Sequence, residues 1–172
     1  GGGIRGLITA MMLERLEHVC PGFFSQIDLF AGTSTGGLLA LGLAAGKSPH
    51  EARKLYEIYG EKVFADTVLD DIRDMGTLLG ADYALQPLRD ALKLEFPGLR
   101  LGDLPKKVLV TAFDLDNQAT APGQARHWKP KFFHNFPGDD SDERQFVVDV
   151  GLYTSAAPTY FPIVDGYIDG GV

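Results

Sequence analysis

Apolar residues follow two different spacings along this chain, and together these spacings predict an α/β fold. Helical spacing is clear in residues 7–19, where the recurring apolar side chains are Leu7, Ile8, Met11, Met12 and Leu16. Residues 107–113 instead form a nearly continuous apolar run, which is typical of a strand in a parallel sheet that is covered on both faces. We therefore expect a mainly parallel central sheet between two layers of helices, a three-layer α/β/α sandwich.

The same criteria place the remaining elements between glycine and proline breaks. Further strands are predicted at residues 27–31, 128–133 and 167–168, and further helices at residues 38–45, 48–63, 86–96 and 145–153. The helix at residues 38–45 is apolar on nearly all sides, so we expect it to be buried. Ser48 and Glu51 form a capping box around Pro49, which marks the start of the next helix. We expect residues 1–172 to form a single domain.

A serine stands between two glycines where a predicted strand passes into a predicted helix, in the sequence Gly32-Thr33-Ser34-Thr35-Gly36. This is the context of a nucleophile elbow, in which the serine occupies a strained turn that exposes its hydroxyl. The flanking glycines remove Cβ atoms that would clash in so tight a bend. The following helix places its positive end near any oxyanion that forms there. The motif is short, and a glycine-rich turn that cradles a phosphate fits it as well.

Two more glycine-rich turns lie at predicted strand ends. Residues 1–6 (GGGIRG) lead into the first helix, and a triple glycine there indicates a close approach of the backbone to another group. Asp169 follows the last predicted strand and precedes Gly170 and Gly171, so we expect it at the carboxyl edge of the sheet, where open α/β sheets place their chemistry. A nucleophile, a base and N–H donors for an oxyanion are the set that acyl transfer requires.

The identity of the base separates two mechanisms. In α/β-hydrolases a histidine comes last in the catalytic order, but no histidine follows Asp169 in this chain. His18 and His50 lie at exposed helical positions, and His127 and His134 flank a predicted strand ahead of the aspartate. A dyad in which Asp169 accepts the proton of the Ser34 hydroxyl is the simpler arrangement.

Four segments together resemble the patatin-like phospholipases, in the order of that family and across the whole chain: GGGIRG at 1–6, GTSTGG at 32–37, AAPTYFP at 156–162 and DGG at 169–171. The resemblance implies a patatin-like variant of the α/β-hydrolase architecture. It also implies a catalytic dyad of Ser34 as nucleophile and Asp169 as base, with no histidine, no metal and no cofactor. The implied activity is hydrolysis of the acyl esters of phospholipids and neutral lipids.

The same resemblance assigns the residues around the dyad. It implies an oxyanion hole formed by Gly1, Gly2 and Gly3, with Arg5 in support, and an elbow whose other members are Gly32, Thr33, Thr35 and Gly36. The family normally carries an aspartate before the triple glycine and a strand before that aspartate. Both are absent from this sequence, so we interpret residues 1–172 as an excerpt that lacks the first strand and any C-terminal extension of the catalytic domain.

Composition narrows the range of partners. The formal net charge is -7, which disfavours nucleic acid but still allows a local patch to contact a membrane. The single cysteine, Cys20, permits no internal disulfide and no metal site built on several cysteines, which is compatible with a reducing compartment. No apolar run reaches the ~18–20 residues of a membrane span. We expect a cytoplasmic protein that binds phospholipid or another acyl lipid at a transient membrane contact.

Other functions fit parts of the same pattern. A neutral-lipid lipase or an acyltransferase would use the same dyad. Phosphate-binding loops of a nucleotide-binding module would explain residues 1–6 and 32–37, although no Gly-Lys-Ser/Thr sequence follows either loop. A lipid-binding protein without catalysis is the third alternative. Apolar side chains between residues 63 and 85 are expected either to contact acyl chains as a lid or to belong to the core: Phe64, Val68, Leu69, Leu78 and Leu79.

Overall fold

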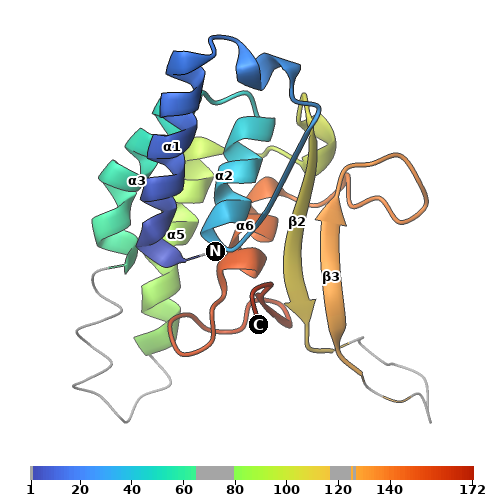
Figure 1. The fold of residues 1–172 in the computed structure, drawn as a ribbon. Coiled ribbons are helices and arrows are strands. Elements are labelled where there is room, and N and C mark those ends of the chain that lie inside the picture. Colours follow the sequence, from blue (N-terminus) through green and yellow to red (C-terminus); the bar gives the residue numbers. More distant parts are fainter. Residues whose placement is uncertain (1, 65–79, 117–124, 126) are drawn as a thin grey trace.

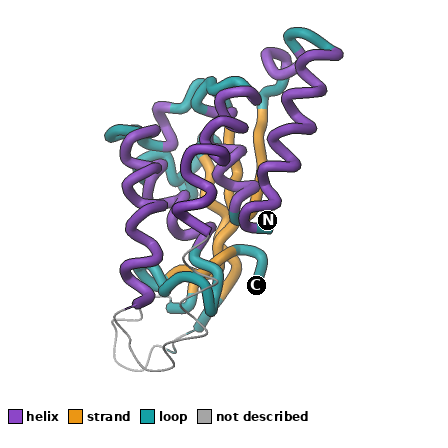
Figure 2. Tube along the Cα trace, turned by 90° about the vertical axis from the view of Figure 1, so that its left-hand side faces the viewer, coloured by secondary structure: helices purple, strands orange, loops and turns teal. Residues whose placement is uncertain are grey.

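The computed structural model describes residues 2–64, 80–116, 125 and 127–172. In these residues a four-stranded mixed sheet carries α-helices stacked against one of its sides (Figures 1 and 2). The predicted α/β architecture is therefore confirmed. Of the residues that the sequence suggested for a lid or the core, 68, 69, 78 and 79 lie outside the described residues, and the side chain of residue 64 is not described.

The elements follow one another in the predicted order. The helices are α1 (Gly6–Val19), α2 (Thr35–Ala44), α3 (Pro49–Phe64), α5 (Gly80–Glu95) and α6 (Val147–Ser155), and the short 3₁₀ turns are η1 (Gly3–Arg5), η2 (Phe23–Gln26) and η3 (Leu101–Asp103). The strands are β1 (Leu29–Thr33), β2 (Lys107–Asp114), β3 (Lys129–His134) and β4 (Tyr167–Asp169). The clearest difference is the start of α5, which begins at Gly80 rather than near residue 86, so that Pro87 lies in the interior of the helix instead of in its first turn. Packing of its apolar stripe against α3 and α6 outweighs the cost of an internal proline.

Strand β2 is the centre of the sheet. It pairs in parallel with β1 and antiparallel with β3 and β4. The expected parallel pairing thus holds for β1, whereas β3 runs the other way. No helix is predicted between β2 and β3, and only parallel neighbours require a crossover helix. Because β3 occupies one edge of β2 along residues 109–114, β1 and β4 must share the opposite edge.

The helices form two tiers over one face of the sheet. Helices α2 and α6 pack directly on the strands, and α1 and α3 pack outside α2 while α5 packs on α6 and α3. On the covered face of β2 the side chains of Val108, Val110 and Ala112 are buried, whereas those of the alternate face are only partly buried. The second helical layer of the expected sandwich is not among the described residues.

Two local predictions are confirmed in detail. Helix α2 is almost entirely buried, as its run of leucine, alanine and glycine indicated. At the start of α3, the Ser48 N–H donates to Glu51 Oε2 at 2.7 Å and the Glu51 N–H donates to Ser48 Oγ at 3.2 Å, which completes the capping box. The hydrogen bonds from Ser48, first of all that from its backbone, hold the pKa of Glu51 below its usual value.

Across the described ranges, no helix combines the length and the apolar character that a bilayer crossing requires. In the same part of the chain, histidine, cysteine, aspartate and glutamate side chains nowhere gather in a group of three or more that would hold a metal ion.

Candidate active site

Ser34 occupies the sharp strand-to-helix turn that the sequence predicts. It follows the last residue of β1 and precedes the first residue of α2, with φ 58° and ψ -132°. A non-glycine residue with this positive φ stores strain of about 1–3 kcal/mol, which is typical of functional turns. Gly32 makes the turn possible, because a Cβ atom there would lie 2.1 Å from the carbonyl oxygen of Gly36. Glycine at position 32 is therefore a steric requirement.

Asp169 lies next to Ser34 because two strands meet end to end. Thr33, the last residue of β1, is opposite Thr111 of β2, and Asp169, the last residue of β4, is opposite the next residue, Ala112. Asp169 ends its strand, as predicted, and although β4 runs antiparallel to β2, it brings Asp169 to the carboxyl end of the parallel strand β1. Both Ser34 and Asp169 are buried, with 9% and 5% of their surfaces exposed.

The end of α6 holds both residues through their backbones. The Ser34 N–H donates to Thr154 Oγ1 at 2.7 Å, in a fully buried position. Two residues further on, the carbonyl of Ala156 accepts a 2.9 Å hydrogen bond from the Asp169 N–H. One short segment therefore fixes the backbone positions of the serine and the aspartate relative to each other.

The two glycines after Asp169 fit tightly around the strand ends. A Cβ atom at Gly170 would lie 2.2 Å from Thr111 Oγ1, and the Thr111 hydroxyl is itself 2.7 Å from the Thr33 hydroxyl. The Gly171 N–H donates to Asp169 Oδ1 at 2.7 Å. This hydrogen bond holds one carboxylate oxygen, Oδ1, and leaves the other, Oδ2, available as a proton acceptor.

The glycine-rich loop at the N-terminus has the conformation that its sequence indicates. Gly2 has φ 138° and Gly3 has φ 56°, values that side-chain-bearing residues rarely adopt, and the Arg5 N–H closes the turn by donating to the Gly2 carbonyl at 3.1 Å. The Arg5 side chain is exposed, so its supporting role stays a prediction. Gly1, the first expected member of the oxyanion hole, lies outside the described residues.

Tyr56 of α3 connects this loop to the elbow. Its hydroxyl donates to the Thr35 carbonyl at 2.8 Å, and a Cβ atom at Gly6 would lie 2.5 Å from the same hydroxyl. One turn along α3, Gly60 makes room for Ile4, since a Cβ atom there would lie 2.6 Å from Ile4 Cδ1. Burial raises the pKa of Tyr56, so its hydroxyl remains protonated and able to donate.

The four histidines lie on different elements of the fold. His134 is paired with Leu109 near the start of β2 and stacks on Phe136. His50 bonds to Glu14 near the start of α3, and His18 lies in the last turn of α1. His127 alone precedes β3 at the end of the sheet where Asp114 lies, and its side chain is exposed.

Sequence reasoning missed two residues that shape this site. Thr154 and Tyr56 belong to no motif: Thr154 lies in an apolar helix, and Tyr56 lies in a helix of mixed apolar and charged residues. Their importance comes from contacts across 120 and 21 residues of sequence, which no local pattern reveals. A buried hydroxyl beside the elbow, Thr35 Oγ1, has no hydrogen-bond partner within the described ranges.

Comparison with known proteins agrees with this geometry. The sequence model of the patatin-like phospholipase family matches residues 1–172. The chain is 40% identical over 179 residues to a cGAMP-activated phospholipase of Pseudomonas aeruginosa, an alignment that covers 100% of this chain and 50% of the relative. It is 33% identical over 171 residues to Protein teg of Priestia megaterium (99% and 50% coverage), and 32% identical over 173 residues to a cGAMP-activated phospholipase of Escherichia coli (94% and 45%).

A strained serine elbow at a strand-to-helix turn of an α/β sheet is the architecture of the α/β-hydrolase class. Within that class, the chain belongs to the patatin-like phospholipase family. The chain spans about half the length of these three curated relatives.

Proposed function

We propose that this chain carries the catalytic site of a phospholipase A-type lipid acyl hydrolase, which cleaves fatty-acyl esters of membrane phospholipids through a dyad of Ser34 and Asp169. The observation that supports it best is the end-to-end meeting of β1 and β4 on one edge of β2, with Ser34 strained and Asp169 buried beside it. Family membership is consistent with this activity.

In the first half of the reaction, Asp169 accepts the hydroxyl proton of Ser34 while Oγ attacks the ester carbonyl carbon. The negative charge that develops on the carbonyl oxygen is stabilised by N–H groups of Gly2 and Gly3 and by the N-terminal end of α2. The Ser34 N–H takes no part, because it is bonded to Thr154. The intermediate then releases the lysophospholipid as an alcohol, which takes its proton from Asp169, and an acyl-enzyme remains.

In the second half, Asp169 accepts a proton from water, and the resulting hydroxide attacks the acyl carbonyl. The fatty acid leaves, and the proton returns from Asp169 to Ser34 Oγ. Each half-reaction therefore begins and ends with Asp169 unprotonated, and Ser34 regains its proton only at the end of the second half. These steps need only the chain, the ester and water, so we propose a mechanism without a cofactor or a metal. An acyltransferase or a neutral-lipid lipase would differ only in the acceptor or in the ester.

The proposed substrate implies contact with a membrane surface. Exposed apolar side chains occur on segments at the end of the sheet where β2 ends: Trp128 is 70% exposed and Ile163 is 60% exposed. Tryptophan is favoured at the interface between water and lipid. We propose that this end of the molecule meets a phospholipid bilayer transiently. Binding to phospholipid vesicles should fall in a Trp128→Ser/Ile163→Ser variant, and equal binding would contradict the membrane contact.

The reaction class is tested by covalent labelling with a fluorophosphonate, which reacts with activated serines. We expect wild type to be labelled at Ser34 and Ser34→Ala to be unlabelled, with release of fatty acid from phospholipid vesicles following the same pattern. Two of the relatives are named cGAMP-activated, so one arm of the assay includes cGAMP. An unlabelled wild type in both arms would favour a binding protein, whether of lipid or of nucleotide.

A further inference from the structure

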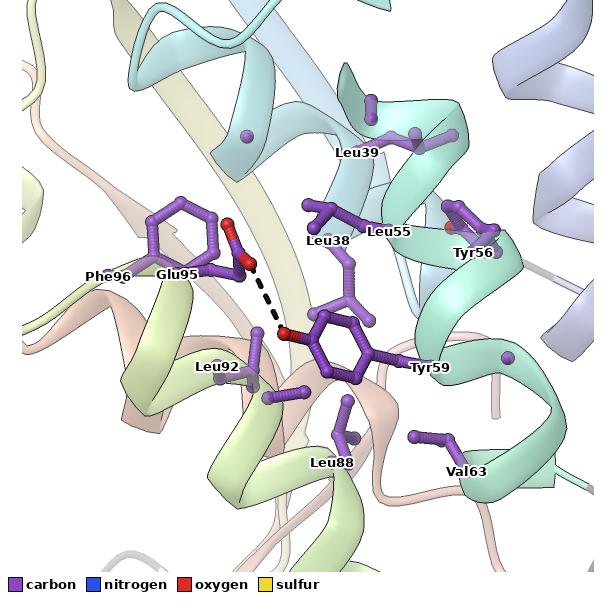
Figure 3. A pocket seen from close by; sticks show the side chains of 14 residues that line it. Leu38, Leu39, Leu55, Tyr56, Tyr59, Val63, Leu88, Leu92, Glu95 and Phe96 are labelled. Carbon is purple, nitrogen blue, oxygen red and sulfur yellow. Dashed lines mark hydrogen bonds between the residues drawn. The ribbon is translucent and has the colours of Figure 1, made fainter. Parts of the chain in front are cut away.

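We infer that the apolar pocket between α2, α3 and α5 holds the acyl chain of the lipid substrate, with the carboxyl end of the chain toward Ser34. This inference rests on the proposed function and adds to it the place where the acyl chain of the substrate binds. Figure 3 shows the pocket, in which side chains of the three helices face one another. Its apolar lining includes Leu38, Leu55, Val63, Leu88, Leu92 and Phe96.

The polar groups that border the pocket already have partners in the protein. The Tyr56 hydroxyl donates to the Thr35 carbonyl at 2.8 Å, and the Tyr59 hydroxyl donates to Glu95 at 3.4 Å. Glu95 also accepts a 2.8 Å ion-paired hydrogen bond from Lys47. The described lining therefore selects a ligand without polar groups. Each methylene transferred from water into such a lining contributes about 0.8 kcal/mol, which suits a fatty-acyl chain.

The pocket begins one helical turn beyond the elbow, at Leu38. Ser34 and Asp169 do not line it, but the N–H of Leu38 donates to the Ser34 carbonyl at 3.1 Å, so Leu38 lies one helical turn from the nucleophile. Tyr56 contacts both the pocket and the carbonyl of Thr35. In an ester whose carbonyl carbon lies at Ser34, the first methylenes of the acyl chain would thus lie against the first turn of α2.

The pocket extends away from the elbow along the helices. On α2 its lining proceeds from Leu38 to Gly42, and on α5 it proceeds from Leu88 to Glu95, a rise of ~10 Å, with Phe96 just beyond the helix. The pair of Lys47, which follows α2, and Glu95, at the end of α5, borders the far end. A linear chain of limited length fits this shape, so we expect the pocket to set chain-length preference.

The test reduces the space at the far end of the pocket and measures, in the full-length protein, the preference for acyl chains of different length. Gly42 is suited to this, because a Cβ atom there would meet only Lys47 Cδ, at 3.8 Å. We expect Gly42→Leu to lower the ratio of kcat/KM for a palmitoyl ester to kcat/KM for a butyryl ester of p-nitrophenol by about tenfold or more. Ala91→Leu adds volume from α5 and should shift the ratio in the same direction. Ile58→Phe and Leu94→Phe add volume at exposed positions of α3 and α5 and serve as controls.

The outcomes separate this inference from the proposed function. If wild type cleaves neither ester and does not react with a fluorophosphonate, the proposed function fails. If wild type cleaves both esters and the ratio in Gly42→Leu and Ala91→Leu equals the ratio in the two controls, the acyl chain binds elsewhere and the inference is overturned. Thermal unfolding confirms that each variant is folded, and labelling of Ser34 by short- and long-alkyl fluorophosphonates repeats the comparison without turnover.

Discussion

Ser34 and Asp169 are each bound through a backbone N–H to the carboxyl end of α6. Ser34 donates to the Thr154 hydroxyl at 2.7 Å, and Asp169 donates to the Ala156 carbonyl at 2.9 Å. Residues 135 apart in sequence are thus positioned by a segment of three residues. The proposed dyad depends on this segment as much as on the two strands that bring its members together.

Removal of the Thr154 hydroxyl should disturb the elbow. In Thr154→Val the buried Ser34 N–H loses its acceptor, which should lower the free energy of unfolding by about 1–3 kcal/mol. Fluorophosphonate labelling of Ser34 should slow as well, because the strained turn loses a support. Thr154→Ser retains the hydroxyl and is the control. Equal labelling rates in the valine and serine variants would show that this hydrogen bond does not position the nucleophile.

Tyr56 is predicted to act as a positioning residue between the N-terminal loop and the elbow. Tyr56→Phe keeps the ring against Gly6 but removes the bond to the Thr35 carbonyl, so the loss of stability should be only about 0.5–1.5 kcal/mol. We expect kcat to fall more than KM rises, because the change affects the reacting groups. Tyr59→Phe removes a more weakly bonded hydroxyl from the same helix and should alter kcat less. A pure KM effect in Tyr56→Phe would contradict the positioning role.

Replacing glycine by alanine should destabilise the fold at position 32 and stabilise it at position 42, because the space around the two residues differs. Gly32→Ala forces a Cβ atom within 2.1 Å of the Gly36 carbonyl oxygen, so the backbone must shift, at a cost of about 1–3 kcal/mol or more. Gly42→Ala introduces its methyl group into open space within a helix and should stabilise the fold by about 0.4–1 kcal/mol. Denaturant unfolding measures both. An alanine at position 32 that leaves stability unchanged would contradict the tight elbow.

The capping box predicts how the free energy of unfolding depends on pH. The folded state lowers the pKa of Glu51 below its usual value of 4.5, so the stability that this carboxylate contributes is present above that pH and is lost as the pH falls through the lowered pKa. Wild type should therefore exceed Glu51→Gln in free energy of unfolding at neutral pH, and the difference should shrink in acid. Ser48→Ala should weaken the same pH dependence, because it removes one of the hydrogen bonds to Glu51. A difference that is constant with pH would contradict the assignment.

The sequence predicted the parts of this site that depend on local geometry. Only glycine fits at position 32, and the strained turn at Ser34 lies between an apolar strand and an apolar helix, so both features are visible in the sequence. The direction of β4 is not visible there. An aspartate followed by two glycines looks the same after a parallel or an antiparallel strand, so the sequence predicted Asp169 at a strand end near Ser34 but not the antiparallel direction of that strand.

The remaining parts of the site depend on long-range packing. Thr154 was one small residue among several near the end of a predicted helix, and nothing distinguished Tyr56 within the helix predicted at residues 48–63. Each gains its role only when α6 and α3 pack against α2. The same holds for the pocket, because its lining comes from three helices that have no common motif.

The most direct test of the dyad is the release of fatty acid from phospholipid vesicles by wild type, Ser34→Ala, Asp169→Asn and His127→Ala/His134→Ala, with cGAMP present and absent. We predict that Ser34→Ala and Asp169→Asn each lose about 10⁴-fold or more of the rate, while the double histidine variant keeps the rate of wild type. A folded histidine variant that loses the rate as completely as Ser34→Ala would contradict the account, since a histidine would then be the base.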